Sequence, residues 1–289
     1  KKFNLMWNLK NKVVVITGAT NGIGKAALFE IAKHGPRLFI TYRNKRRTKD
    51  LLFKLRKINS ELKIELVYCD FSYQSSVREC AKEISLKTKE VDVLINNAGV
   101  FNIKYYETLE GIENTFAVNH LGYFLFTNLL LNKMTAYKET RIINVASEIH
   151  NSLAKLNWKD MNFCKNYGEG INAYAQSKLS NLMFTRLLSL KVARNNISVN
   201  ALHPGVISTG IGDQSRSFLG KIAKLLLVTP FSKSSKDGAA SIIYLSTEDY
   251  AFVTGEYFID CKRAEASSYS QDLSEAKKLW DLSEKLVGE

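Results

Sequence analysis

A tyrosine and a lysine stand four residues apart in the segment Tyr174-Ala175-Gln176-Ser177-Lys178, inside a long stretch with helical periodicity. Positions i and i+4 of an α-helix lie on one face, one turn apart. A cation held close to a phenol favours the phenolate, so the pKa of Tyr174 can fall from about 10 towards the range of a general acid or base. The pair therefore predicts proton transfer. The alternative is an ordinary amphipathic helix with a half-buried tyrosine and a solvated lysine.

A glycine-rich turn near the start of the chain predicts a site for the phosphates of a nucleotide. The β-branched run of residues 12–17, KVVVIT, is expected to be a buried strand, and residues 25–34 have helical periodicity. Glycines between a strand and a helix let the backbone approach a pyrophosphate, and the amino end of the helix offers N–H donors. The residues expected to bind a dinucleotide cofactor here are Gly18, Thr20, Asn21, Gly22, Ile23 and Gly24.

The residue after the second predicted strand, residues 37–42, indicates which dinucleotide is bound. NAD-binding folds usually carry an acidic residue here for the ribose hydroxyls, whereas this chain has Arg43, followed by basic residues at 45, 46 and 47. A carboxylate would repel a 2′-phosphate, and a guanidinium can form two hydrogen bonds to it. The sequence therefore favours NADP(H) over NAD(H); the alternative is a basic helix start without a ligand.

The remaining periodicity predicts an α/β fold, a single-domain Rossmann-type doubly wound parallel sheet of about seven strands with helices on both faces. Further strands are expected at residues 63–69, 91–95, 141–145, 197–202 and 256–259. Helices are expected up to about residue 59, at 73–89, 109–119 and 121–134, through Tyr174 to about 194, at 236–246 and, as a carboxyl-terminal extension, at 271–287. No linker or internal repeat divides residues 1–289, so one domain is expected.

Composition excludes several classes of protein. With 45% apolar and 24% charged residues the chain is neither disordered nor fibrous. Four cysteines without a Cys-x-x-Cys pair argue against a disulfide framework or a zinc site, and no metal is expected. The net charge of +13 is spread along the chain. We expect a solvated surface; a phosphate-rich cofactor, an anionic membrane surface and nucleic acid are alternatives, although no RNA-binding motif or one-faced basic helix is visible.

Nothing in the sequence predicts a membrane span. No apolar run reaches the roughly 18 residues that a bilayer requires, and the amino end has no signal-peptide pattern. Because the chain starts on a lysine, any anchor or leader would lie before Lys1. The expected location is the cytoplasm or the periphery of an intracellular membrane.

Several motifs follow one another along the chain: Thr17-Gly18-x-x-x-Gly22-Ile23-Gly24, Asn96-Asn97-Ala98-Gly99, Asn119, Ser147, Tyr174-x-x-x-Lys178 and Pro204-Gly205. In this order and approximate spacing, residues 10–260 resemble the short-chain dehydrogenase/reductase family. Within it the chain is most similar to the retinol dehydrogenase and WW-domain oxidoreductase group, although no WW domain is present. That similarity is carried by Asn119-His120-Leu121-Gly122-Tyr123-Phe124, His203-Pro204-Gly205-Val206 and Leu279-Trp280-Asp281-Leu282-Ser283.

The resemblance implies hydride transfer between the nicotinamide of NADP(H) and an alcohol or carbonyl carbon. It implies that Tyr174 exchanges the proton with the substrate oxygen and that Lys178 lowers the tyrosine pKa and holds the nicotinamide ribose. Ser147 would stabilise the developing alkoxide, and Asn119 would hold a water that links Lys178 to solvent. Taken singly, Ser147 could be a strand-end hydroxyl and Asn119 a helix cap.

The resemblance also implies further contacts to the cofactor. Asp70, at the end of a predicted strand, would touch the adenine, and Thr209 would reach the nicotinamide amide. The other residues expected to bind the cofactor are Phe71, Asn97, Ala98, Gly99, Pro204, Gly205 and Val206, together with Tyr174 and Lys178. Ala146 stands where many relatives have a second serine, which should be tolerated because Ser147 matches the catalytic one.

Two apolar segments indicate the kind of substrate. Ser147 and Tyr174 are 27 positions apart, farther than in most of the family, and the insertion spans residues 148–170. Residues 206–230 are expected to form an apolar substrate flap beyond the strand ends. We expect both to surround a lipophilic carbonyl or alcohol, such as a retinal-, steroid- or lipid-aldehyde-like compound. A surface excursion and an ordinary packed helix pair are the respective alternatives.

The leading hypothesis is therefore an NADP(H)-dependent oxidoreductase that interconverts a lipophilic aldehyde or ketone and its alcohol. The alternative is an NADP(H)-binding regulatory or interaction protein on the same fold, with incidental turnover. No nucleic acid partner is expected. Relatives in the family are often dimers or tetramers, so a homodimer is open.

Overall fold

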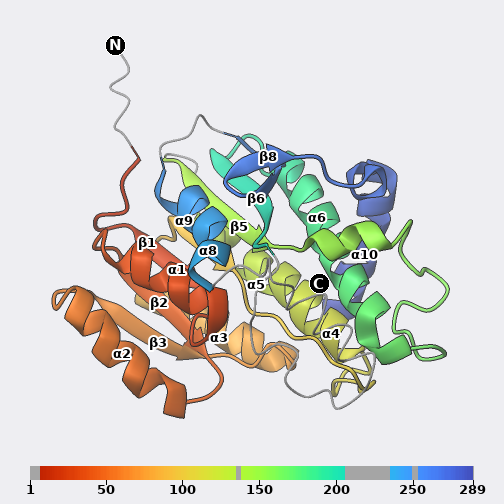
Figure 1. Cartoon of the computed structure of the whole chain (residues 1–289), viewed down its shortest axis with the longest axis horizontal. Helices are drawn as coiled ribbons and strands as arrows, with labels where there is room; N and C mark the ends of the chain where they lie inside the picture. The colour runs from red at the N-terminus through yellow and green to blue at the C-terminus, as the bar shows by residue number, and fades with distance from the viewer. Residues whose placement is uncertain (1–6, 135–137, 206–234, 249–252, 289) are drawn as a thin grey trace.

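In the computed structural model, which describes residues 7–134, 138–205, 235–248 and 253–288, eight strands form one sheet with helices on both faces (Figure 1). The α/β class and the Rossmann-type winding predicted from the sequence are confirmed. The predicted flap at 206–230, which includes Val206 and Thr209, lies outside the described residues.

The sheet has the strand order β3-β2-β1-β4-β5-β6-β7-β8, and all neighbours are parallel except β7 and β8. The winding reverses between β1 and β4, where doubly wound folds bind ligands. The bounds are β1 Val13–Ile16, β2 Arg37–Tyr42, β3 Ile64–Tyr68, β4 Val93–Asn96, β5 Thr140–Val145, β6 Ile197–His203, β7 Tyr257–Ile259 and β8 Lys262–Ala264.

Strand β8 is an addition to the approximately seven strands predicted. It returns antiparallel to β7 through a two-residue turn, Asp260 and Cys261, whose φ values are 49° and 62°. A turn with two positive φ values matches the right-handed twist of a hairpin. The three residues of β8 are too few and too polar to produce a strand pattern in the sequence.

Two large apolar clusters, one on each face, hold the sheet between its helices, beside a third cluster of four residues. Along β1 the side chains of Val13 and Val15 join one cluster, and those of Val14 and Ile16 join the other. This alternation is the two-residue period of a strand, and because both faces are covered the strand is apolar throughout.

The helices of the described residues mostly match the predicted ones. Their bounds are α1 Gly22–Ala32, α2 Arg46–Ile58, α3 Gln74–Lys87, α4 Asn114–Phe116, α5 Gly122–Leu130, α6 Ile171–Lys191, α8 Ser235–Gly238, α9 Ala240–Thr247 and α10 Leu273–Val287. Short 3-10 turns occur at Leu131–Lys133, Glu148–Ser152, Gly168–Gly170 and Ser268–Gln271.

The start predicted at residue 109 and the boundary predicted between the helices 109–119 and 121–134 are both wrong. Residues 107–113 form a tight turn around Gly111, whose φ is +72°, and Leu109 is 87% exposed. The helix starts only at Asn114, and a π turn, Ala117–Leu121, joins α4 to α5 without a break. The extra residue of a π turn shifts the phase of the apolar pattern, which a sequence analysis interprets as a boundary.

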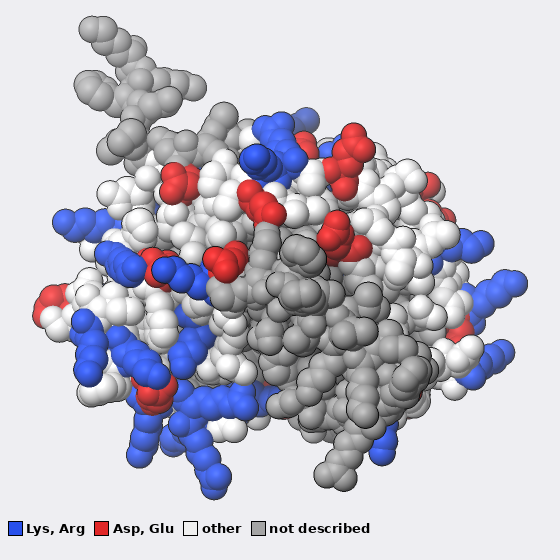
Figure 2. Space-filling model, viewed as in Figure 1, with Lys and Arg blue, Asp and Glu red and all other residues white. Residues whose placement is uncertain are grey.

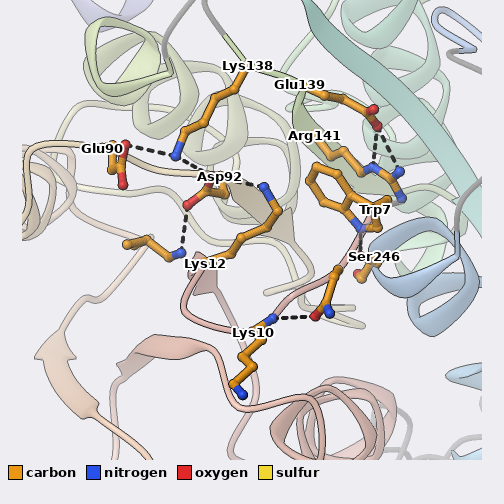
Figure 3. A network of polar contacts seen from close by, with 11 residues as sticks. Trp7, Lys10, Lys12, Glu90, Asp92, Lys138, Glu139, Arg141 and Ser246 are labelled. Carbon is orange, nitrogen blue, oxygen red and sulfur yellow. Dashed lines mark hydrogen bonds and ion pairs between the residues drawn. The ribbon is translucent and has the colours of Figure 1, made fainter. Parts of the chain in front are cut away.

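A tryptophan ahead of β1, Trp7, contacts the amino end of β5. The Arg141 guanidinium lies 3.7 Å from the centre of the Trp7 ring, and the Trp7 indole N–H donates to the Ser246 carbonyl at 2.7 Å (Figure 3). Arg141 is fully buried, forms an ion pair with Glu139 at 2.7 Å and donates to the Leu245 and Glu248 carbonyls. These partners make burial of the guanidinium tolerable.

A buried aspartate just before β4 completes this edge of the sheet. Asp92 accepts from the Val13 amide at 2.7 Å and pairs with Lys138 at 2.7 Å and Lys12 at 3.5 Å (Figure 3). The amino ends of β1, β4 and β5 are therefore joined by charge-assisted contacts.

The carboxyl-terminal helix α10 covers α5 and α6. The centre of the Trp280 ring lies 4.8 Å from that of the Phe124 ring and 5.9 Å from that of the Phe184 ring. The Ser283 hydroxyl is 2.9 Å from His120 Nε2. Burial lowers the pKa of His120 to about 3, so this imidazole is neutral at ordinary pH. The motif at 279–283, to which the sequence assigns no chemistry, therefore packs against the residue next to Asn119.

Among the helices of the described residues, none combines the length and the apolar character needed to cross a lipid bilayer.

Candidate active site

The sequence-predicted site residues follow the carboxyl ends of neighbouring strands. Gly18 follows β1, Asn97 follows β4, Ser147 follows β5, and Pro204 with Gly205 follows β6. Arg43 and Asp70 take the corresponding places after β2 and β3. Because these strands are parallel, the fold brings all of them to one edge of the sheet, on both sides of the β1/β4 switch point.

The glycine turn between β1 and α1 is packed tightly against the segment that follows β4. A Cβ at Gly18, where φ is +66°, would lie 2.6 Å from the Ala98 Cα, and one at Gly24 would lie 2.3 Å from Asn97 Nδ2. The Asn97 side-chain amide, Nδ2, donates to the carbonyls of Thr17 at 2.8 Å and Gly18 at 3.1 Å. The Thr17 hydroxyl accepts from the backbone amides of Asn97 and Ala98, each at 2.9 Å. Side chains larger than hydrogen would separate these two segments.

This turn fits the diphosphate of a dinucleotide. Helix α1 begins at Gly22, and the side chain of its N-cap, Asn21, makes no capping hydrogen bond. The first amides of the helix therefore keep their donors for an anion, at the positive end of the helix dipole. The first turn also contains no acidic residue that would repel a phosphate.

The end of β2 carries a basic surface. Arg43 is exposed directly after β2, and α2 continues with basic side chains that outnumber its one acidic residue, Asp50. Figure 2 shows Lys and Arg side chains gathered over the edge of the molecule where Figure 1 places α2. The buried positions of α2 are Thr48, Leu51 and Leu55, so its charges share the outward faces.

Two further residues predicted to contact the cofactor, Asp70 and Phe71, have partners within the protein. Asp70 Oδ1 accepts from the Ser72 amide at 3.0 Å and so shapes its own turn. The Phe71 ring is buried, with its centre 5.7 Å from that of the Phe126 ring.

Tyr174 and Lys178 share a face of α6, as their spacing predicts. The Lys178 ammonium is buried, donates to the Val145 carbonyl at 2.9 Å and lies 5.6 Å from the centre of the Tyr174 ring and 5.8 Å from that of Tyr123. Tyr174 is half-buried, and Phe101 contacts its ring edge-to-face at 5.4 Å.

The pKa values of this pair differ from the expectation. Burial raises the pKa of Tyr174 to about 12 and lowers the pKa of Lys178 to about 7. The ammonium faces the plane of the ring, and desolvation disfavours the charged form of both groups. A lowered tyrosine pKa is therefore not seen in the protein alone; an additional partner for the ammonium would be needed to produce it.

We expect Lys178 to make stability depend on pH. A lysine whose pKa in the folded protein is about 7 binds fewer protons than the unfolded chain between pH 7 and the ordinary lysine value of about 10.4, so stability rises with pH across this window. The free energy of unfolding of the wild type, minus that of Lys178→Met, should grow by more than about 1 kcal/mol from pH 7 to pH 10. Denaturant titrations of both proteins at several pH values measure it, and a constant difference would contradict a depressed pKa.

Asn119 lies inside the π turn and is fully buried, so it is not a helix cap. Its Oδ1 accepts from the Val100 amide at 2.8 Å, and its Nδ2 donates to the Val100 carbonyl at 2.9 Å and to Ser177 Oγ at 3.0 Å. The Ser177 hydroxyl in turn donates to the Tyr174 carbonyl at 2.7 Å. Asn119 therefore joins the segment after β4 to the helix of Tyr174 and Lys178. Such π turns are frequent at functional sites.

Gly99 lies between these side chains. A Cβ at this position would be 3.3 Å from Asn119 Oδ1 and 3.8 Å from Lys178 Nζ, which places the predicted Asn119 and Lys178 around one point of the backbone.

Ser147 follows Ala146, whose amide still pairs with β6 by donating to the Leu202 carbonyl at 2.8 Å. The Ser147 hydroxyl caps the turn Glu148–Ser152 through a long contact of 3.4 Å to the Ile149 amide, and its carbonyl lies 2.7 Å from His150 Nδ1. The structure thus shows the strand-end position that the sequence offered, beside the start of the insertion.

The insertion is packed against the core through part of its length. Four of its apolar residues belong to, or pack against, the apolar cluster that Val13 and Val15 join: Leu153, Leu156, Trp158 and Met161. Trp158 also donates to Glu275 Oε2 of α10 at 2.6 Å. This segment therefore forms part of the structure next to Ser147 and Tyr174.

Gln176 is a structural residue that the sequence analysis did not identify. It stands between Tyr174 and Lys178, is fully buried, accepts from the Asn157 amide at 2.8 Å and donates to the Met161 carbonyl at 2.9 Å. Both partners belong to the insertion, so helix α6 binds that segment directly through Gln176. The only signal in the sequence is a polar residue on the inner side of the helix.

Comparisons with known proteins agree with this geometry. The family model for short chain dehydrogenase matches residues 12–159 and 160–219. Retinol dehydrogenase 14 of Mus musculus is 35% identical over 292 residues, which cover 97% of this chain and 87% of that protein. Retinol dehydrogenase 13 of Homo sapiens is 35% identical over 289 residues, covering 97% and 86%.

Solved structures show the same fold. An uncharacterized protein from Mycobacterium paratuberculosis is similar with a TM-score of 0.76 and 28% identity, over 98% of this chain and 96% of that one. A blue fluorescent protein from a metagenomic library, solved in complex with NADPH, has a TM-score of 0.69 and 27% identity, over 87% and 96%.

Proposed function

The chain belongs to the short-chain dehydrogenase family and is an oxidoreductase of alcohol and carbonyl groups, and we propose that it uses NADP(H) and acts on lipophilic aldehydes or ketones and their alcohols. The observation that carries this proposal is the convergence of Tyr174, Lys178, Asn119 and Ser147 at the carboxyl edge of the sheet, beside the glycine turn.

Each of these side chains has a distinct task in the proposed reaction. Tyr174 gives its proton to the carbonyl oxygen during reduction and takes it back during oxidation, for which a pKa of about 12 in the free protein keeps it protonated beforehand. Ser147 donates its hydroxyl to the same oxygen and stabilises negative charge that develops there. Asn119 holds the backbone at Val100 and, through Ser177, the helix turn of Tyr174.

Bound NADP(H) supplies the hydride for reduction or accepts it in oxidation. The glycine turn and the α1 amides would hold its diphosphate. Lys178 has one hydrogen bond among the described residues, to the Val145 carbonyl, and its other N–H donors would hold the ribose hydroxyls on the nicotinamide side. A negatively polarised partner would also raise the Lys178 pKa, so that the ammonium favours the Tyr174 phenolate.

The preference for NADP(H) over NAD(H) is supported by Arg43. Its guanidinium stands exposed at the end of β2, with the basic face of α2 around it and no carboxylate at the position that usually holds ribose hydroxyls. The local positive potential favours the additional charge of a 2′-phosphate.

The lipophilic substrate is supported by an aromatic contact at Tyr174 and by the apolar character of the insertion. Phe101 contacts the Tyr174 ring edge-to-face, and Leu153, Trp158 and Met161 of the insertion pack against the apolar core. The relatives named retinol dehydrogenases are, by that name, enzymes of a lipophilic alcohol.

A panel of carbonyl compounds tests the proposal. Purified protein should oxidise NADPH with hydrophobic aldehydes or ketones, with kcat/KM rising along a series of straight-chain aldehydes from short to long because each buried CH₂ contributes about 0.8 kcal/mol. A charged carbonyl of equal length, such as an aldehyde acid, is the matched control and should react poorly. Equal rates for both, or no oxidation of NADPH with any member, would contradict the proposed substrate class.

A further inference from the structure

Glu113 is a buried carboxylate that the proposed chemistry does not use. Its exposed fraction is 1%, and its two oxygens accept from the Thr115 and Phe116 amides, each at 2.7 Å. These are the first free amides of α4, the helix that continues through the π turn to Asn119. A carboxylate that caps two amides at the positive end of a helix is held firmly. Glu113 therefore fixes where this helix begins.

The insertion reaches Glu113 at two places. Asn162 Oδ1 accepts from the Glu113 amide at 3.1 Å, and Asn162 Nδ2 donates to the Gly111 carbonyl at 2.9 Å. The Tyr167 hydroxyl lies 3.0 Å from Glu113 Oε1. One residue thus receives a backbone contact and a side-chain contact from the segment that precedes Tyr174.

A third segment meets the same carboxylate through Tyr167. The Tyr167 hydroxyl is 2.8 Å from the Asn102 carbonyl, and its single proton can be given either to that oxygen or to Glu113. Asn102 belongs to the segment after β4 in which Val100 pairs with Asn119. A Cβ at Gly170, where φ is +77°, would be only 1.9 Å from the Asn102 carbonyl oxygen, so this segment also touches the start of α6.

These contacts join the three parts of the chain that carry Asn119, Val100 and Tyr174. Gly170 caps α6, and Tyr174 lies in the first turns of that helix. Glu113 is six positions before Asn119 in the other helix. Burial raises the pKa of Glu113, and its amide partners oppose that rise, as expected for a desolvated carboxyl held by hydrogen bonds. Each partner that is removed leaves a buried polar atom, which costs about 1–3 kcal/mol.

We propose that Glu113, through Tyr167, is a positioning residue that sets Asn119 and Tyr174 at their working separation by joining the helix start, the segment after β4 and the insertion. The hydrogen bonds of Glu113 and Tyr167 go to the Thr115 and Phe116 amides, to the Asn102 carbonyl and to each other, so both act on Tyr174 indirectly. The kinetic test of this proposal rests on the proposed function, because the test needs turnover of a carbonyl substrate with NADPH.

The test compares two pairs of variants of the full chain. Tyr167→Phe removes the phenol that links Glu113 to Asn102, and its control is Tyr106→Phe, since Tyr106 is 48% exposed and donates to the Asn102 side chain in a weaker 3.4 Å contact. Glu113→Gln removes the charge and one acceptor of the helix cap, and its control is Glu110→Gln at an exposed position of the same turn.

We expect Tyr167→Phe and Glu113→Gln to lower kcat by about 10- to 100-fold, as the loss of one or two buried hydrogen bonds would if it acts on the transition state. KM for the carbonyl and the dissociation constant of NADPH should change by less than about 3-fold. Both control variants should keep the kcat of the wild type. The proposal is overturned if Tyr167→Phe matches Tyr106→Phe in kcat, or if its loss of kcat is accompanied by an equal loss of NADPH affinity.

Amide hydrogen exchange gives a readout that does not depend on turnover. Tyr167→Phe should exchange faster than Tyr106→Phe in residues 114–121 and in residues 171–178, because the starts of both helices lose the hydrogen bonds of the Tyr167 hydroxyl to Glu113 and Asn102. If the wild type turns over no carbonyl, the proposed function fails while faster exchange in both regions still supports the positioning role. Unchanged exchange in either region would overturn the proposed positioning role of Glu113 and Tyr167. This readout compares Tyr167→Phe with Tyr106→Phe, so it holds even if Glu113→Gln does not fold.

Discussion

Replacing Tyr174 by phenylalanine should lower kcat by about 10²- to 10⁴-fold, the range that a positioned general acid or base contributes. The variant loses only the hydroxyl, so the ring contact with Phe101 and the neighbouring Lys178 ammonium keep their places. NADPH should still bind, since the glycine turn and Arg43 are unchanged. Absorbance of NADPH in the presence of a hydrophobic aldehyde measures turnover, and cofactor fluorescence measures binding.

Tyr123→Phe is the matched control for this change. Tyr123 presents its ring to the same ammonium, at 5.8 Å, from α5, and is fully buried. Its loss of kcat should be far smaller than that of Tyr174→Phe. If the two variants lose activity equally, the hydroxyl of Tyr174 is not the proton donor. Full biological activity of Tyr174→Phe in the cell would favour the alternative of a cofactor-binding interaction protein.

Replacing Arg43 by aspartate should weaken NADPH binding by about 100-fold or more. A charge-assisted hydrogen bond contributes about 1.5–3 kcal/mol, and the new carboxylate would repel the 2′-phosphate while offering acceptors to the ribose hydroxyls of NAD(H). Affinity for NADH should therefore rise or stay constant. Dissociation constants for both cofactors, measured at one ionic strength, give the change in preference.

Lys49→Asp separates a contact from a general field. Lys49 is exposed on α2, and its substitution changes the net charge by the same amount as Arg43→Asp. A loss of NADPH affinity much smaller than that of Arg43→Asp is expected. Equal losses would mean that the basic surface acts only through its summed potential and that Arg43 has no specific place at the phosphate.

The sheet could be predicted because its strands carry their own signal. Strand β2 has the predicted bounds, and β1 lies within the predicted run, since strands covered on both faces read as continuous β-branched segments. Gly18 and Gly24 could be predicted for the same local reason, a turn between a strand and a helix. The switch point then places Asn97, Ser147 and Gly205 without further information.

What could not be predicted depends on contacts between distant positions. Gln176 and Glu113 have ordinary sequence surroundings, and their partners lie in the insertion, whose path follows no periodic pattern. The pKa shifts of Tyr174 and Lys178 likewise come from burial by other segments. Spacing along a helix shows which residues share a face, but it does not show how much solvent that face loses.

The π turn explains the one large error in the helices. Between Ala117 and Leu121 the backbone holds one residue more than a regular helix would. Deleting a residue there would restore regular hydrogen bonds but would rotate everything before it by about 100° relative to α5. Either Phe116 would leave the core or Asn119 would leave Val100, so the irregular turn lets one helix satisfy both.

The contact between Trp7 and Arg141 has a practical consequence for handling the protein. Trp7 and Arg141 meet at the amino ends of the strands, whereas Gly18, Ser147 and Gly205 follow their carboxyl ends, so Trp7 lies on the side of the sheet away from the candidate site. A linker attached ahead of Trp7 and coupled to a bead or electrode would therefore orient the immobilised enzyme with its candidate site facing outward, accessible to substrate dissolved in the surrounding medium.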